Sequence, residues 1–175
     1  MRSKSNQNSK GRSRARGKVV RHDDLSSDKE GGGPVQLTTR QIDLITNHVK
    51  KHIGAAPTVF HEIFSPDIHL DVLPIQPTKA CPFKTFVTMG MSALPMSLPR
   101  GYKGPSRLEL CIVLPSDWPT DEKALSAPGE KYYWPIGQLK SVARVPSGSD
   151  SFLTMGHTIA DTEPPEPFNK SCRFV

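Results

Sequence analysis

The sequence predicts an α+β fold, with a mixed, mostly antiparallel sheet and flanking helices. An amphipathic stretch at helical spacing comes first, a series of short apolar segments separated by prolines follows, and a second helical stretch comes after most of them. The 175 residues include 35% hydrophobic side chains, 17 prolines and 13 glycines, a composition typical of a globular protein with many turns. This length suits one domain with a substantial core.

The first helix is predicted to begin after Thr38. Thr38 and Gln41 have the spacing of a capping box, in which each side chain bonds to the backbone of the other residue. Apolar residues then recur at helical intervals, at Ile42, Ile45, Val49 and Ile53. Gly54 and Pro57 supply the stop, so we expect an amphipathic helix of about four turns.

Short apolar segments indicate the strands of the sheet. We predict strands at residues 59–63, 68–73, 84–89, 107–114 and 151–159, and an apolar strand that is cut short at 171–175. Residues 107–114 give the clearest pattern, and because both faces are largely apolar we expect a central strand there. A second helix is predicted to begin at Trp134-Pro135 and to end at Pro146.

The positive charge is concentrated at the N-terminus. The net charge is +6, but eight of the 23 Lys and Arg residues lie within residues 1–21, where no acidic residue occurs, which leaves 15 basic against 17 acidic side chains and a net charge of −2 for the rest. We therefore predict a disordered basic arm at residues 1–36 and one domain at 37–175. The arm suits phosphate binding, nuclear import or simple solvation, and an over-long start-codon assignment explains it equally well.

Cysteine usage favours a reducing compartment. Cys81, Cys111 and Cys172 are widely spaced and odd in number, which indicates reduced, buried thiols instead of a disulfide framework or a zinc knuckle. The N-terminus lacks the apolar core of a signal peptide, and no stretch approaches the ~20 apolar residues of a membrane span. We expect a cytoplasmic protein that does not bind a membrane.

The sequence specifies no catalytic set. Ser92 lies between Gly90 and Leu94, and the nucleophile elbow of hydrolases needs a glycine where Leu94 stands. His69 and Asp71 share one strand face, and His157 in principle completes a set with Ser92, but no spacing specifies such an arrangement. We therefore predict that the protein is not an enzyme.

No cofactor or metal site is predicted either. His48 and His52 lie one turn apart on the first helix, but no Glu stands between them as in the H-E-x-x-H pattern, so a solvated face is expected. Residues 31–33 are three glycines without the Lys-Ser/Thr of a phosphate loop.

A series of short motifs resembles the Suppressor of fused family along nearly the whole ordered length. The motifs, in chain order, are HLDV at 69–72, FVTMGMS at 86–92 with Pro95-Met96 and Pro99 after it, LEL at 108–110, and LPSDWP at 114–119. They continue with YWPI at 133–136, VAR at 142–144, GHTI at 156–159, and PPEPF at 164–168. We assign most of these residues to fold maintenance, with Met89, Met91 and Met96 as flexible residues that fill the core.

This resemblance implies a protein-binding module. Animal members hold Gli-type transcription factors by binding an extended peptide, and many bacterial members are predicted immunity proteins, or antitoxins, against secreted toxins. The motifs here are of the bacterial type, so the resemblance favours neutralisation of a toxin by stoichiometric binding. The alternative is a regulatory binder of a transcription factor or a nucleic-acid-associated protein, in which the basic arm contacts phosphates and offers the one route to nucleic acid.

The expected partner-binding surface also follows from the resemblance. Residues 155–157 match a part of the animal protein near its peptide cleft, Val145 falls where the animal helix carries an aromatic contact, and the acidic proline-rich loop at 163–167 is a candidate rim. The predicted partner-binding residues are Val145, Met155, Gly156, His157, Glu163 and Glu166. Domains of the family usually continue past the strand at 171–175, so we expect a C-terminally incomplete domain that self-associates through its open sheet.

Overall fold

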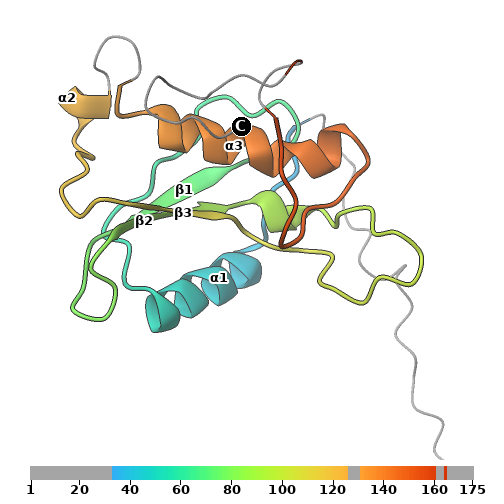
Figure 1. The fold of residues 1–175 in the computed structure, drawn as a ribbon, viewed down its shortest axis with the longest axis horizontal. Coiled ribbons are helices and arrows are strands. Elements are labelled where there is room, and N and C mark those ends of the chain that lie inside the picture. The colour runs from blue at the N-terminus through green and yellow to red at the C-terminus, as the bar shows by residue number, and fades with distance from the viewer. Residues whose placement is uncertain (1–32, 126–130, 161–163, 165–175) are drawn as a thin grey trace, which may run out of the picture. The chain divides into compact units, whose positions relative to one another are not determined.

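The computed structural model describes residues 33–125, 131–160 and 164 (Figure 1). A three-stranded sheet lies at the centre, with β2 (Lys84–Met89) between β1 (Asp71–Ile75) and β3 (Cys111–Leu114) and both pairs antiparallel. The helical elements are α1 (Thr39–His52), the 3-10 turn η2 (Met91–Ala93), α2 (Glu122–Leu125) and α3 (Trp134–Gly148). The predicted α+β class is confirmed.

Helix α1 forms as its sequence predicts. The Thr38 backbone N–H donates to Gln41 Oε1 at 2.8 Å, and the Gln41 backbone N–H donates to Thr38 Oγ1 at 3.3 Å. Lys50, Lys51 and His52 occupy the last turn, where positive charge complements the helix dipole. The helix therefore has favourable groups at both ends.

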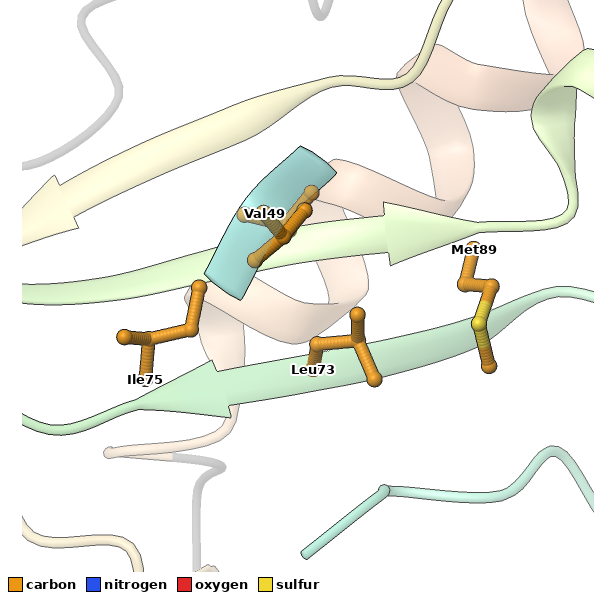
Figure 2. Packing of buried hydrophobic residues seen from close by; sticks show 5 residues of the cluster. Val49, Leu73, Ile75 and Met89 are labelled. Carbon is orange, nitrogen blue, oxygen red and sulfur yellow. The ribbon is translucent and has the colours of Figure 1, made fainter. Parts of the chain in front are cut away.

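Helices cover both faces of the sheet, α1 on one side and α3 on the other (Figure 1). On the α1 side, Val49 packs over side chains of β1 and β2, namely Leu73, Ile75, Val87 and Met89 (Figure 2). On the α3 side, the alternate residues Val72 and Phe86 pack with Leu114 and with Ile136 and Leu139 of the helix. Burial on both faces explains why β1 and β2 are buried at every position.

The prediction that Met89, Met91 and Met96 fill the core is confirmed. Met91 and Met96 are buried with Ile68, Leu70 and Ala143 at the end of the sheet beside η2, and Met89 is buried in the cluster under α1. Their flexible side chains fill irregular spaces between the sheet, the loop after β2 and α3.

Two predicted early strands are shorter than expected. Residues 59–63 contribute one bridge, between Phe60 and Val72, and the strand predicted at 68–73 begins at Asp71, preceded by a parallel bridge between Ile68 and Val35. The reason lies in the side chains, because the Asp71 carboxylate accepts the Glu62 backbone N–H at 3.0 Å and so replaces a strand partner.

The prediction of a central strand at residues 107–114 is wrong in the length of the strand and in its position in the sheet. Only Cys111–Leu114 of residues 107–114 is a strand, and among the described residues it lies at the edge of the sheet, with Val113 55% exposed. Regular pairing stops because Thr88 Oγ1 accepts the Leu110 N–H at 2.8 Å and the Glu109 side chain turns to the loop after β2.

The end of α3 and the segment after it also differ from prediction. The helix begins at Trp134-Pro135 as expected but continues through Pro146, whose side chain is buried, to Gly148. Pro146 lacks the N–H of one helical hydrogen bond, and its burial in the core offsets this loss. Residues 151–159 are not a strand; they run irregularly past residues 96–102, and the Ser97 N–H donates to the Ser151 carbonyl oxygen at 3.1 Å. A turn at Gly156, with φ of 89°, interrupts this segment.

The thiols are less buried than predicted. Cys81 is half-buried and Cys111 is exposed on the edge strand, and both are free. Cys172, the strand predicted at 171–175 and the expected consequences of an incomplete domain lie outside the described residues. In the part of the chain that the structure describes, no helix is both long and apolar enough to cross a membrane.

Candidate functional site

Three of the predicted partner-binding residues form a turn at the surface. Met155, Gly156 and His157 are all exposed, and the His157 N–H donates to the Thr154 carbonyl oxygen at 3.2 Å. Val145 is half-buried on α3, earlier in the chain. Glu163 and Glu166 lie outside the described residues. The turn at 155–157 is therefore the part of the predicted surface whose geometry can be examined.

Side chains on both sides of the turn fix it in place. The Phe152 ring makes an edge contact with the His157 ring at a centroid distance of 5.0 Å and also contacts Tyr102 at 5.3 Å. The Tyr102 hydroxyl lies 2.7 Å from Thr154 Oγ1. Met155 extends from this base and is 98% exposed. The turn thus combines an ordered base with a free apolar side chain.

The loop after β2 is held by one carboxylate, that of Glu109. Its oxygens accept the backbone N–H groups of Gly90, Met91 and Ser92 at 3.0–3.2 Å and the hydroxyls of Ser92 and Thr88 at 2.6 and 2.7 Å. Ser92, considered above as a nucleophile, donates its proton to this carboxylate. The motif at 86–92 therefore maintains the fold.

Arg144 of α3 ties a polar loop to the helix. Its guanidinium donates to Glu62 Oε2 at 2.7 Å and to Asp67 Oδ1 at 3.0 Å, and Lys140 lies 3.4 Å from Glu62 Oε1. The Glu62 side chain is 8% exposed. Burial alone would raise the pKa of Glu62, but hydrogen bonds from Arg144, Ser65 and the Leu70 backbone, with the charge of Lys140, lower it below its usual value.

Asp67 behaves in the same way. Burial opposes its ionisation, but the Ile68 backbone N–H, Arg144 and Ser147 together lower the pKa of Asp67. The same two carboxylates raise the pKa of Arg144 against the opposing effect of burial. The loop from Glu62 to Asp67 therefore carries two ionised carboxylates bound to one arginine.

Two histidines meet a buried carboxylate beside this loop. His61 Nδ1 lies 3.1 Å from Asp71 Oδ2, and His69 Nε2 lies 3.1 Å from Asp71 Oδ1. Ser65 Oγ lies 3.0 Å from the other ring nitrogen of His69 and donates to Glu62 Oε2 at 2.8 Å. Since the Ser65 proton is directed at Glu62, His69 does not act as a base towards Ser65, despite the Ser, His and Asp composition.

A shallow pocket with both apolar and polar side chains lies beside the same loop. Its volume is about 540 Å³, and its lining includes Val59, Phe60, Leu125, Tyr133 and Ile136. Ile63 and Phe64 stand at its edge with largely exposed side chains. The lining also includes His61, Glu62 and Lys140, so polar and apolar side chains face the same pocket.

Comparison with protein-family models decides the family. The model of Suppressor of fused protein (SUFU) matches residues 66–175. The chain belongs to the Suppressor of fused family. Neither a curated protein nor a solved structure matches it. The resemblance carried by the short motifs is confirmed.

Membership gives the function in general terms. Suppressor of fused is a family of protein-binding, regulatory domains and not a family of enzymes. The match includes the turn at 155–157, Arg144, His69 and Asp71, whereas His61, Glu62 and Ser65 precede it. The family's core region and the residues just before it thus meet in one loop cluster.

Sequence reasoning missed the partners of Arg144, the contact of His61 with Asp71 and the contact of Ser65 with His69. Glu62 and Asp67 are separated from Arg144 by 82 and 77 residues, so no local pattern indicates the contact. His69 and Asp71 share a strand-like spacing that did place them together, but His61 belonged to a segment predicted as a separate strand, and Ser65 lay outside every predicted element. Two histidines and three carboxylates within residues 61–71 were the available signal.

Proposed function

We propose that this domain neutralises a partner protein, a toxin, by binding it stoichiometrically in the cytoplasm, and that the turn at Met155, Gly156 and His157 is part of the contact surface. The observation that carries the proposal is the combination of a 98% exposed methionine with a turn whose base is fixed by Phe152 and Tyr102. Preordered loops lose little entropy on binding, and exposed apolar side chains beside them suit the centre of an interface.

Charge supports a basic target. The chain outside residues 1–21 has 15 basic against 17 acidic side chains. We place Glu163 and Glu166 at the rim of the contact surface and Val145 beside it, on the helix that precedes the turn. So small a charge imbalance steers association modestly, so most of the affinity is expected from the buried contacts.

The test is co-expression of the full chain with the toxin-like secreted protein encoded beside its gene. Cells are expected to survive only with this chain present, and affinity purification should recover an equimolar complex. Met155→Gln should weaken the complex at least about tenfold if Met155 is an anchor. The matched control is Leu44→Gln, which changes an exposed apolar residue on α1, away from the turn, and should leave affinity unchanged. Equal cell death with and without the chain would show that the proposal is wrong.

Charge reversal separates the rim from the anchor. Glu163→Lys and Glu166→Lys together should slow association and reduce its salt dependence, with a smaller effect on dissociation. Asp43→Lys on α1 is the control for a general change in net charge. Equal effects from the control would assign no rim role to the two glutamates.

A regulatory binder of a nucleic-acid-associated protein is the second candidate, favoured by the eight basic residues within residues 1–21. In that case the full chain should bind duplex DNA with an affinity that falls steeply with salt, and deletion of residues 1–21 should abolish the binding. Absence of DNA binding at low salt would remove this candidate.

A further inference from the structure

We propose that His61, His69 and Asp71 form a binding site for a divalent transition metal of the Zn²⁺ type. This inference concerns a different part of the molecule from the proposed partner surface and does not depend on it. One ring nitrogen of each histidine and one carboxylate oxygen of Asp71 all lie within 4.8 Å of one another. Within the described residues, no other group of three such side chains is found.

The distances suit a metal ion of this class. Each histidine nitrogen lies 3.1 Å from one oxygen of Asp71. Two ligand atoms that each lie about 2.0–2.2 Å from one tetrahedral Zn²⁺ are roughly 3.3 Å apart. Both nitrogen–oxygen pairs therefore need movements of only a few tenths of an ångström to share an ion, and the third pair, between the histidines, closes by rotation of the exposed His61 ring.

The direction of the hydrogen bonds identifies the free lone pair of His69. Arg144 donates to Glu62 Oε2 at 2.7 Å, so this carboxylate is an ionised acceptor, and the single Ser65 hydroxyl proton is directed to it at 2.8 Å. With the Ser65 proton on this bond, the tautomer that gives Ser65 Oγ a second hydrogen bond carries its proton on His69 Nδ1, 3.0 Å away. In the neutral ring, the Nε2 lone pair consequently faces the Asp71 oxygen.

Two lone pairs that face each other at 3.1 Å repel unless a cation lies between them. A proton on Nε2 or a metal ion can fill this role, and a metal ion also uses His61, which faces the second oxygen of the same carboxylate. In addition, the Nδ1–H bond to Ser65 is the kind of outer contact that orients metal-binding histidines. The chain Arg144, Glu62, Ser65 therefore sets the tautomer that a ligand needs.

The surroundings hold one side of the site rigid and leave the other open. Asp71 is buried at the start of β1, and its Oδ1 atom also accepts the Glu62 N–H at 3.0 Å. His61 is 72% exposed, so an ion can enter from solvent and keep water in its remaining position. Two imidazole nitrogens with one carboxylate favour Zn²⁺ and related ions over Mg²⁺ and Ca²⁺, which prefer sets of oxygen ligands.

The experiment uses the full chain, stripped with a chelator and dialysed. Titration calorimetry with Zn²⁺ alone should show saturable binding of one equivalent, and Co²⁺ should give the visible absorption of a site with nitrogen and oxygen ligands, without a thiolate band from the exposed Cys111. Millimolar Mg²⁺ or Ca²⁺ should not compete. Loss of one ligand in His61→Gln or His69→Gln should weaken binding by more than tenfold, and Ser65→Ala by roughly 10–100-fold.

The control is the other histidine pair. His48 and His52 lie one turn apart on α1, with ring centroids 4.5 Å apart, and are exposed. His48→Gln with His52→Gln should leave the Zn²⁺ titration unchanged. The exposure of His61 makes His61→Gln a variant that keeps the fold, which circular dichroism checks. Absence of saturable Zn²⁺ binding to the wild-type chain, full binding by folded His61→Gln, or loss of binding in the α1 variant would each overturn the proposal.

Discussion

The loops at Gly90 and Gly156 both need a glycine with positive φ, and their surroundings differ completely. Gly90 has φ of 143°, and a Cβ atom there would lie 2.1 Å from the His69 carbonyl oxygen, whereas Gly156 has φ of 89° and open space around it. The first loop is buried and bound by Glu109; the second is exposed and held only at its base. Similar motif glycines can therefore have different roles, one in packing and one in shaping a free surface.

Gly90→Ala should have the largest effect on stability. The substitution combines an unfavourable backbone conformation with a clash against backbone, and we expect the free energy of unfolding to fall by about 4 kcal/mol. Gly156→Ala adds the backbone strain without a clash and should cost about 1 kcal/mol. Urea denaturation of both variants measures the difference, and equal losses would mean that close approach at Gly90 is unimportant.

Arg144→Ala tests the ion pairs that Arg144 makes with Glu62 and Asp67. Glu62 would keep a nearly buried carboxylate, and among the described residues Lys140 would be its remaining ion-pair partner, so we expect a loss of about 3 kcal/mol. The matched control is Arg100→Ala at an exposed position, which should change stability by less than about 0.5 kcal/mol. A loss in Arg144→Ala no larger than in the control would show that the network is a surface feature.

The same network predicts a dependence on acid. The folded-state pKa values of Glu62 and Asp67 are lowered from 4.5 and 3.8, so their contribution is present above these values and is lost as pH falls through the folded-state values. The melting temperature of the wild-type chain should therefore fall steeply below about pH 4.5.

Arg144→Ala supplies the control for this pH dependence. Without the guanidinium, the main hydrogen bond that lowers the pKa of Glu62 is absent, so less stability remains to be lost in acid. The melting temperature of the variant should change less between pH 6 and pH 3 than that of the wild type. Parallel curves for the two proteins would assign the acid dependence to other groups.

Local patterns predicted the elements that depend on nearby residues. The Thr38 and Gln41 pair, helix α1 and the strand Lys84–Met89 appear where the sequence places them, because capping and side-chain alternation act over a few residues. The predicted apolar stripe of α1 is correct at Ile45, Val49 and Ile53, which pack in the core, whereas Ile42 is exposed. The edge position of β3 and the absence of a strand at 151–159 were not predictable in this way, because they depend on Thr88, Glu109 and Tyr102, which act across the fold.

The candidate sites show the same division. The exposed turn at 155–157 was expected from the family resemblance, and the pairing of His69 with Asp71 follows from their shared strand spacing. The contribution of Arg144 depends on Glu62, which is distant in sequence and reaches the helix only after the chain folds. Arg144 lies within a family motif, which indicated that the residue matters to the domain but did not identify the residues that it contacts.

His157→Ala should have the smallest effect on stability and is the sharpest test of the difference between the two loops. The exposed ring makes one edge contact with Phe152 at 5.0 Å, so its removal should cost about 0.5 kcal/mol. If the ring is buried against the partner protein, the complex should dissociate faster while the association rate stays nearly constant, because a short-range ring contact acts only after the two proteins have met. Surface plasmon resonance with the co-purified partner measures both rates. His48→Ala on α1 is the control, and equal dissociation rates for the two variants would place the contact surface away from this turn.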